Sequence, residues 1–186
     1  MAEGAYQTPL GDVVVDRALA AELSAACPLL ADDRAAHQGE HAIEVVLPFL
    51  QWLAPDGLAI VPVVIGSDDP GECGQVAEAL ASVIGRSPEP VLLIASADLT
   101  HYEPRAVVEQ KDTAILEAVR HLDVEELDHR LAQEPSVVCG RAIIRTAVGA
   151  AARLGATDAQ VIRYATSADA GGDPHSAIGY AGILLV

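Results

Sequence analysis

Apolar positions along the chain follow two spacings, one typical of strands and one typical of helices. Residues 58–65 and 91–95 are continuous apolar runs bounded by turn residues, which predicts strands buried on both faces. Pro62 lies in the first run and indicates an edge-like strand at that point. Residues 74–84 have helical periodicity. This part of the chain is therefore predicted to form a strand, a helix and a second strand.

Five further helices are predicted. Asp16 suits the N-cap of a helix that carries Leu19 on its apolar face. A second helix is expected over residues 40–53, where Pro48 predicts a kink or an early end, because its ring removes a donor and crowds the preceding turn. The others are expected at residues 105–121, 124–133 and 141–154, the last ending at Gly155.

The chain closes with two β-rich segments, residues 160–166 and 177–186, joined by the loop SADAGGDPHS. A length of 186 residues with 51% hydrophobic content suits one domain with one core. The alternation of elements predicts an α/β fold, as a single three-layer domain over residues 1–186 with a mainly parallel sheet flanked by helices.

Acidic side chains outnumber Lys plus Arg by 27 to 11, which gives a net charge of −16. This field repels phosphate groups, so nucleic acid is not an expected partner. An anionic membrane surface is also a poor partner, because Lys111 is the only lysine. The chain has no basic leader and no apolar run near the ~20 residues of a spanning helix. With three widely spaced cysteines, it is expected to be cytoplasmic.

The first of three segments that could carry chemistry contains His37, Glu40, His41 and Glu44. If a helix began early enough, positions 37, 41 and 44 would share one face, where two imidazoles and a carboxylate can bind a divalent metal. The alternative is a capped helix start, in which Glu40 meets the helix dipole and His41 packs locally. The spacing favours this alternative.

The second segment, SADLTHY at residues 96–102, directly follows the apolar run at residues 91–95. Ligands of parallel α/β sheets gather beyond the carboxyl ends of strands. Asp98 could there orient His101 as a general base or acid. The alternative is a loop closed by Asp and Thr side-chain hydrogen bonds, with His101 on the surface. The residues support the acid–base pair and the surface loop equally.

The third segment, residues 138–141, places Cys139 and Arg141 immediately before a predicted helix. A thiol at a helix N-terminus beside a guanidinium has a lowered pKa, which suits a thiolate ligand or a nucleophile. The alternative is a small buried cysteine at a turn of the chain.

Five motifs in order give a resemblance to the Memo family, which includes the AmmeMemoRadiSam system protein B members. The motifs are TPLG at residues 8–11, EHAIEVVLPFLQ at 40–51, SADLTHY at 96–102, CGR at 139–141 and IGYAG at 178–182. The resemblance implies a fold related to the class III extradiol dioxygenases, which cleave catechol-type rings with non-haem iron(II) and dioxygen.

The resemblance also implies site residues. His101 stands where the dioxygenases keep an acid/base histidine, with Asp98 as its partner, and Cys139 stands where the family's pocket cysteine approaches a metal. The implied pocket residues are Glu40, His41, Tyr102 and Arg141.

The resemblance covers the C-terminal portion of the usual family domain. Memo-like proteins usually carry an earlier region whose two histidine motifs supply metal ligands, and this chain is expected to be N-terminally incomplete. His37 is the substitute imidazole that the chain offers. The implied cofactor is Fe(II) or another divalent metal, or none in this chain. A homo-oligomer or a complementing chain is expected, because the missing region would leave a sheet edge uncovered.

The leading hypothesis is a Memo-like protein with a dioxygenase-like pocket that takes a small molecule or a peptide. Whether the chain is an enzyme is left open. The alternative is a non-catalytic scaffold that binds a protein or peptide in the same pocket. A third hypothesis is a thiol hydrolase or transferase that uses Cys139 with His101.

Overall fold

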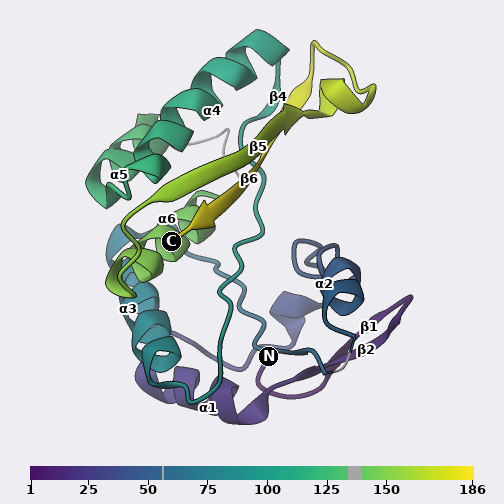
Figure 1. Ribbon diagram of the computed structural model, residues 1–186, viewed down its shortest axis with the longest axis vertical. Coiled ribbons are helices and arrows are strands. Elements are labelled where there is room, and N and C mark those ends of the chain that lie inside the picture. The colour runs from purple at the N-terminus through teal and green to yellow at the C-terminus, as the bar shows by residue number, and fades with distance from the viewer. Residues whose placement is uncertain (56, 134–139) are drawn as a thin grey trace. The chain divides into compact units, whose positions relative to one another are not determined.

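The computed structural model describes residues 1–55, 57–133 and 140–186 of the chain (Figure 1). These residues form two compact units. The first contains Met1–Ser67 and Ser82–Val91, and the second contains Asp68–Ala81 and Leu92–Val186. The expectation of one domain over residues 1–186 stays a prediction.

The first unit is built on a small three-stranded sheet with the order β1-β2-β3. β1 (Ala5–Thr8) pairs antiparallel with β2 (Gly11–Val15), and β2 pairs parallel with β3 (Ala59–Ile60). Its helices are α1 (Arg17–Ala26), the short 3-10 helix η1 (Ala35–His37) and α2 (Leu47–Leu53). α1 begins at the predicted cap, where the Asp16 carboxylate accepts the Leu19 N–H at 3.0 Å.

The second unit contains an antiparallel sheet with the order β4-β6-β5. Its strands are β4 (His101–Glu103), β5 (Ala159–Thr166) and β6 (Ala177–Leu185), and the 3-10 helix η2 (Ser167–Ala170) joins the last two. Its helices are α4 (Arg105–Arg120), α5 (Val124–Gln133) and α6 (Arg141–Arg153). α3 (Pro70–Arg86) lies in this unit up to Ala81.

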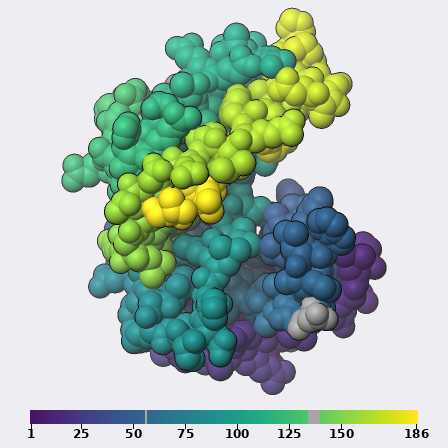
Figure 2. Space-filling model, viewed as in Figure 1, coloured from purple at the N-terminus to yellow at the C-terminus, as the bar shows by residue number. Residues whose placement is uncertain are grey.

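α4 packs against β5 and β6, and α5 contacts both α4 and α6. Figure 2 shows the residues of α4 and β5 side by side on one face. The core between these elements consists of aliphatic side chains, as the low aromatic content of the sequence requires. Its buried members are Leu99, Ile115, Leu116, Ala118, Val119, Leu127, Leu131, Val148 and Ala159.

The predicted α/β fold is confirmed, and so are most of the predicted helices. The pairing differs from the mainly parallel sheet that the apolar runs predicted. Of residues 58–65, only Ala59–Ile60 pairs as a strand, and within the described residues no strand pairs with residues 91–95. Leu92 is 75% exposed. An apolar run predicts that a segment suits a buried strand, but it does not say whether neighbouring strands are present to pair with it. The expected homo-oligomer or complementing chain stays a prediction.

The prediction of a helix over residues 40–53 was wrong at its start. Turns occupy residues 42–46, and α2 begins only at Leu47. Pro48 lies in the first turn of α2, where its missing N–H costs nothing. The proline therefore marks the beginning of this helix and not its kink or end.

Within the described residues, every helix is too short or too polar to cross a membrane.

Candidate functional site

Asp98 and His101 lie in contact in the second unit. His101 Nε2 is 3.0 Å from Asp98 Oδ2, and the imidazole is only 14% exposed. Because an ionised carboxylate can only accept, Nε2 carries the proton in this hydrogen bond. The Asp98 side chain is 46% exposed. The Asp98 carboxylate thus orients the imidazole, an arrangement that suits a general acid or base.

A β-bulge at Tyr102 shapes the end of this segment. His101 pairs with Ile178 and Glu103 with Ala177, so Tyr102 is the extra residue on β4. Its φ of 55° lies in the left-handed region that an aromatic residue rarely adopts. The Tyr102 ring lies 5.5 Å from the His101 ring, centre to centre, and is 74% exposed. The bulge therefore places an exposed phenol beside the imidazole.

Tyr180 on β6 was not predicted to belong to this site. Burial raises its pKa, and so do the charge of Asp98 and the neighbouring Tyr102. Gly179, the residue before it, exchanges main-chain hydrogen bonds with Leu99 and Thr100. Tyr180 therefore lies near Asp98 because β6 runs beside this segment. The IGYAG motif contains it, but no local spacing links residue 180 to residue 98.

Gly140, in the described part of the third predicted segment, lies against the second segment. A Cβ built on Gly140 would approach the Cβ of Ala97 within 2.0 Å, so the start of α6 touches the segment that carries Asp98. Arg141 forms an ion pair with Asp68, which lowers the pKa of Asp68 through their hydrogen bond. Arg141 is therefore engaged in holding the residues before α3. Cys139 lies outside the described residues.

The first predicted segment lies in the other unit, and its side chains do not converge as a helix would place them. His37 ends η1, and its ring nitrogens contact the Tyr6 hydroxyl and the Met1 amine, each at 2.8 Å. Burial lowers the pKa of His37, and so does the Met1 ammonium. His41 is exposed. The shared face that an early helix would have given positions 37, 41 and 44 does not form, because no helix spans residues 37–44.

Glu40 caps the turn that follows it. One carboxylate oxygen accepts the N–H groups of Ala42 and Ile43, both at 2.9 Å. The sequence offered a capped helix start as the alternative, but these hydrogen bonds close a turn, because α2 begins only at Leu47. Two effects raise the pKa of Tyr6 to about 12, of which burial is the larger and that of the Glu40 carboxylate the smaller.

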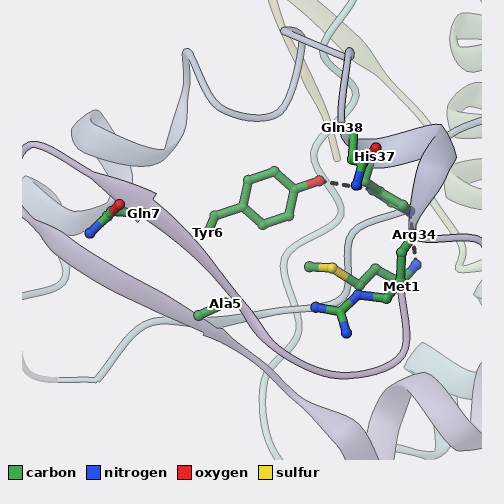
Figure 3. Close-up of a pocket in the computed structure, with 7 residues that line it drawn as sticks. All are labelled: Met1, Ala5, Tyr6, Gln7, Arg34, His37 and Gln38. Atoms are coloured by element: carbon green, nitrogen blue, oxygen red, sulfur yellow. Dashed lines mark hydrogen bonds between the residues drawn. The ribbon is translucent and has the colours of Figure 1, made fainter.

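Two hollows lie in the first unit. One of about 240 Å³ contains Tyr6, Arg34 and His37 in its lining, and the hydrogen bond from Tyr6 to His37 crosses it (Figure 3). The other, of about 570 Å³, lies beside Trp52 and Leu58. Asp98 and His101 line neither hollow.

The described residues do not assemble the metal site that the resemblance to the class III extradiol dioxygenases implies. Within residues 1–55, 57–133 and 140–186, no three His, Cys, Asp or Glu side chains are arranged to hold a metal ion. Both ring nitrogens of His37 are in hydrogen bonds, one with the Tyr6 hydroxyl and one with the Met1 amine. The prediction that His37 and Cys139 bind a metal stays a prediction.

Changing Glu40 to Gln is expected to lower the Tyr6 pKa from about 12 toward the ordinary value of about 10. The raised pKa stabilises the fold fully below about pH 10, and this contribution is lost between about pH 10 and 12. NMR titration of 13Cζ-labelled tyrosine measures the shift. Glu44→Gln is the matched control, because Glu44 is exposed and does not contribute to the Tyr6 shift. Equal shifts in both variants would contradict the assignment.

Comparison with known proteins gives a consistent result. A family model described as Memo-like protein matches residues 1–184. The chain is 36% identical over 180 residues to a MEMO1 family protein of Methanosarcina barkeri, and the aligned region covers 97% of this chain and 67% of that protein. It is 35% identical over 185 residues to a MEMO1 family protein of Methanopyrus kandleri, with 100% and 65% covered. The chain thus spans about two thirds of the length of these relatives.

Proposed function

The chain belongs to the Memo-like protein family, and from this premise we propose that it contributes an acid–base pair, Asp98 and His101, to a pocket like that of the class III extradiol dioxygenases. The 3.0 Å contact between His101 Nε2 and Asp98 Oδ2 carries the proposal. The nearby phenols of Tyr102 and Tyr180 support it, because they offer hydrogen bonds and ring surfaces to an aromatic ligand.

The proposed role of His101 is to take the proton of a phenolic hydroxyl. The His101 imidazole, oriented by its hydrogen bond to Asp98, is the group that accepts this proton. The Asp98 carboxylate stabilises the imidazolium that forms. Tyr102 and Tyr180 would orient the substrate. A dioxygenase also needs a metal, and because the described residues do not assemble its ligands, no step of the proposed chemistry uses one.

The test is oxygen uptake on a panel of catechols, with the metal content of the purified chain measured in parallel. His101→Ala is expected to lower the turnover of an active preparation by about 10²–10⁴-fold, the usual contribution of a general acid or base. His129→Ala is the matched control, because the His129 side chain is 63% exposed on α5. No uptake by the unaltered chain with any divalent metal, or equal turnover in the two variants, would overturn the proposal.

A non-catalytic peptide-binding function is the second candidate, and the exposed side chains of α2 favour it. The chain has one Phe and one Trp, and both lie exposed on this helix, Phe49 at 71% and Trp52 at 77%. Asp12 joins Trp52 in lining the 570 Å³ hollow. With a net charge of −16, the chemistry that fits is a basic peptide with an apolar side chain.

Trp52 fluorescence tests this candidate, because it is the only tryptophan and reports on this surface alone. Short peptides of alternating Arg and Leu are expected to shift its emission, whereas Glu–Leu peptides of equal length leave it unchanged. The candidate is removed if neither peptide, or both, shift the emission.

A further inference from the structure

The segment that carries Asp98 and His101 is anchored at Leu99 and Thr100. Leu99 is 5% exposed and belongs to the aliphatic core of the second unit. Its N–H donates to the Gly179 carbonyl at 3.1 Å, and the Gly179 N–H donates to the Thr100 carbonyl at 2.9 Å. These two hydrogen bonds join the segment to β6. The Thr100 N–H takes part in neither of them.

The acceptor of the Thr100 N–H is Asp112 on α4, a carboxylate that is 0% exposed. Its Oδ1 accepts the Thr100 N–H at 3.0 Å, and its Oδ2 accepts the Tyr164 hydroxyl at 2.8 Å. A buried carboxylate is costly unless donors satisfy it, and these two bonds do so. Burial and the bond to Asp112 raise the pKa of Tyr164 well above its usual range, so the phenol keeps the proton that it donates.

Asp112 has no room to move on the side of β6. A Cβ at Gly179 would lie 1.7 Å from Asp112 Oδ2, so only glycine fits opposite the carboxylate. Among the described residues, the buried Thr100 Oγ1 has no hydrogen-bond partner. The Asp112 carboxylate therefore holds this segment to α4 through the main-chain N–H of Thr100.

We infer that Asp112 is a positioning residue for the Asp98–His101 pair and acts through the main chain of Thr100. Thr100 follows Asp98 by two residues and precedes His101 by one, so one fixed N–H sets the separation of both side chains. The inference deepens the proposed function and rests on it for its meaning. The effect of Asp112 on the positions of Asp98 and His101 can be measured without substrate or metal.

The experiment reads the His101 ring and the Thr100 amide in the 15N-labelled full chain. Long-range 1H–15N spectra at a pH where the imidazoles are neutral report the tautomer of His101, which the loss of signals in His101→Gln identifies. In Asp112→Ala, the Thr100 amide is expected to exchange with deuterium about tenfold faster or more. The Nε2–H tautomer of His101, which Asp98 holds, is expected to mix with the Nδ1–H tautomer.

Leu131→Ala controls for stability, since it empties part of the same core from α5 and touches none of the hydrogen bonds of Asp112. It is expected to keep a single His101 tautomer. If Asp112→Ala does not fold, Asp112→Asn takes its place, because asparagine keeps the shape of the side chain and removes its charge. The same two measurements are made on this variant, and a smaller change is expected in both. An unchanged tautomer in the Asp112 variant that folds, or the same mixing in Leu131→Ala, would overturn the inference. A chain that takes up no oxygen but shows the expected tautomer change would refute the proposed function alone.

Discussion

Replacing Gly179 with alanine is expected to lower the free energy of unfolding by about 3 kcal/mol, near the upper end of what overpacking costs. The new Cβ would lie 1.7 Å from Asp112 Oδ2 and 3.1 Å from Val108 Cγ1. Asp112 cannot swing aside without giving up its bonds to Thr100 and Tyr164, which would leave a buried carboxylate unsatisfied. Urea unfolding followed by circular dichroism measures the loss.

Gly182 on the same strand is the matched control. A Cβ there meets nothing within 4 Å, so Gly182→Ala is expected to be neutral or to stabilise the chain by about 0.5 kcal/mol, because alanine restricts the unfolded state. Combining Gly179→Ala with Asp112→Ala should cost less than the sum of the two changes, because the clash disappears with the carboxylate. Equal losses at positions 179 and 182, or additive losses in the double variant, would contradict the packing described here.

Replacing Arg145 with methionine is expected to cost about 2 kcal/mol of stability, because it removes the donors of a largely buried guanidinium from a partly exposed carboxylate and a main-chain carbonyl. The Arg145 side chain is 8% exposed, its Nε donates to Asp128, and its Nη1 donates to the Asp68 carbonyl at 3.0 Å. Burial alone would lower the Arg145 pKa, but the hydrogen bond and charge of Asp128 raise it above its ordinary value. Methionine keeps the aliphatic packing and leaves both acceptors without their donor.

Arg120→Met provides the comparison. Arg120 pairs with Glu117 at 3.4 Å, with side chains 49% and 54% exposed, and an exposed pair of this kind contributes less than about 0.5 kcal/mol. Arg145→Lys should fall between the two, since lysine restores the charge but cannot donate to two acceptors in a fixed fork. A loss in Arg145→Met no larger than that in Arg120→Met would show that the network around Asp68 contributes little.

Helices were predicted well where the information is local. α1 begins at the Asp16 cap, and α6 is followed by Gly155 with its positive φ of 97°. Caps and apolar faces depend on residues three or four positions apart, so the sequence contains them directly. Pro48 was read incorrectly because a proline inside a helical pattern equally suits a first turn, and only the packing of the following residues decides between them.

The candidate site divides in the same way. Asp98 and His101 are three residues apart and were predicted as a pair from the sequence. Asp112 was missed, although a carboxylate on the apolar face of α4, between Val108 and Ile115, was a visible signal. Nothing local shows which donors would satisfy it.

By itself, the sequence determined most of the helices, the α/β class and the family, and it offered Asp98 with His101 as one of two possibilities, because each depends on short spacings or on motifs in order. Only the tertiary structure decided which strands pair and what satisfies the buried carboxylate. Asp112 lies 12 residues from Thr100 and 52 from Tyr164, and hydrogen bonds over such separations form only between segments that the folded chain brings together. Residues 91–95 pair with no strand of the described part of the chain for the same reason, since a strand needs a neighbour that its own residues do not specify.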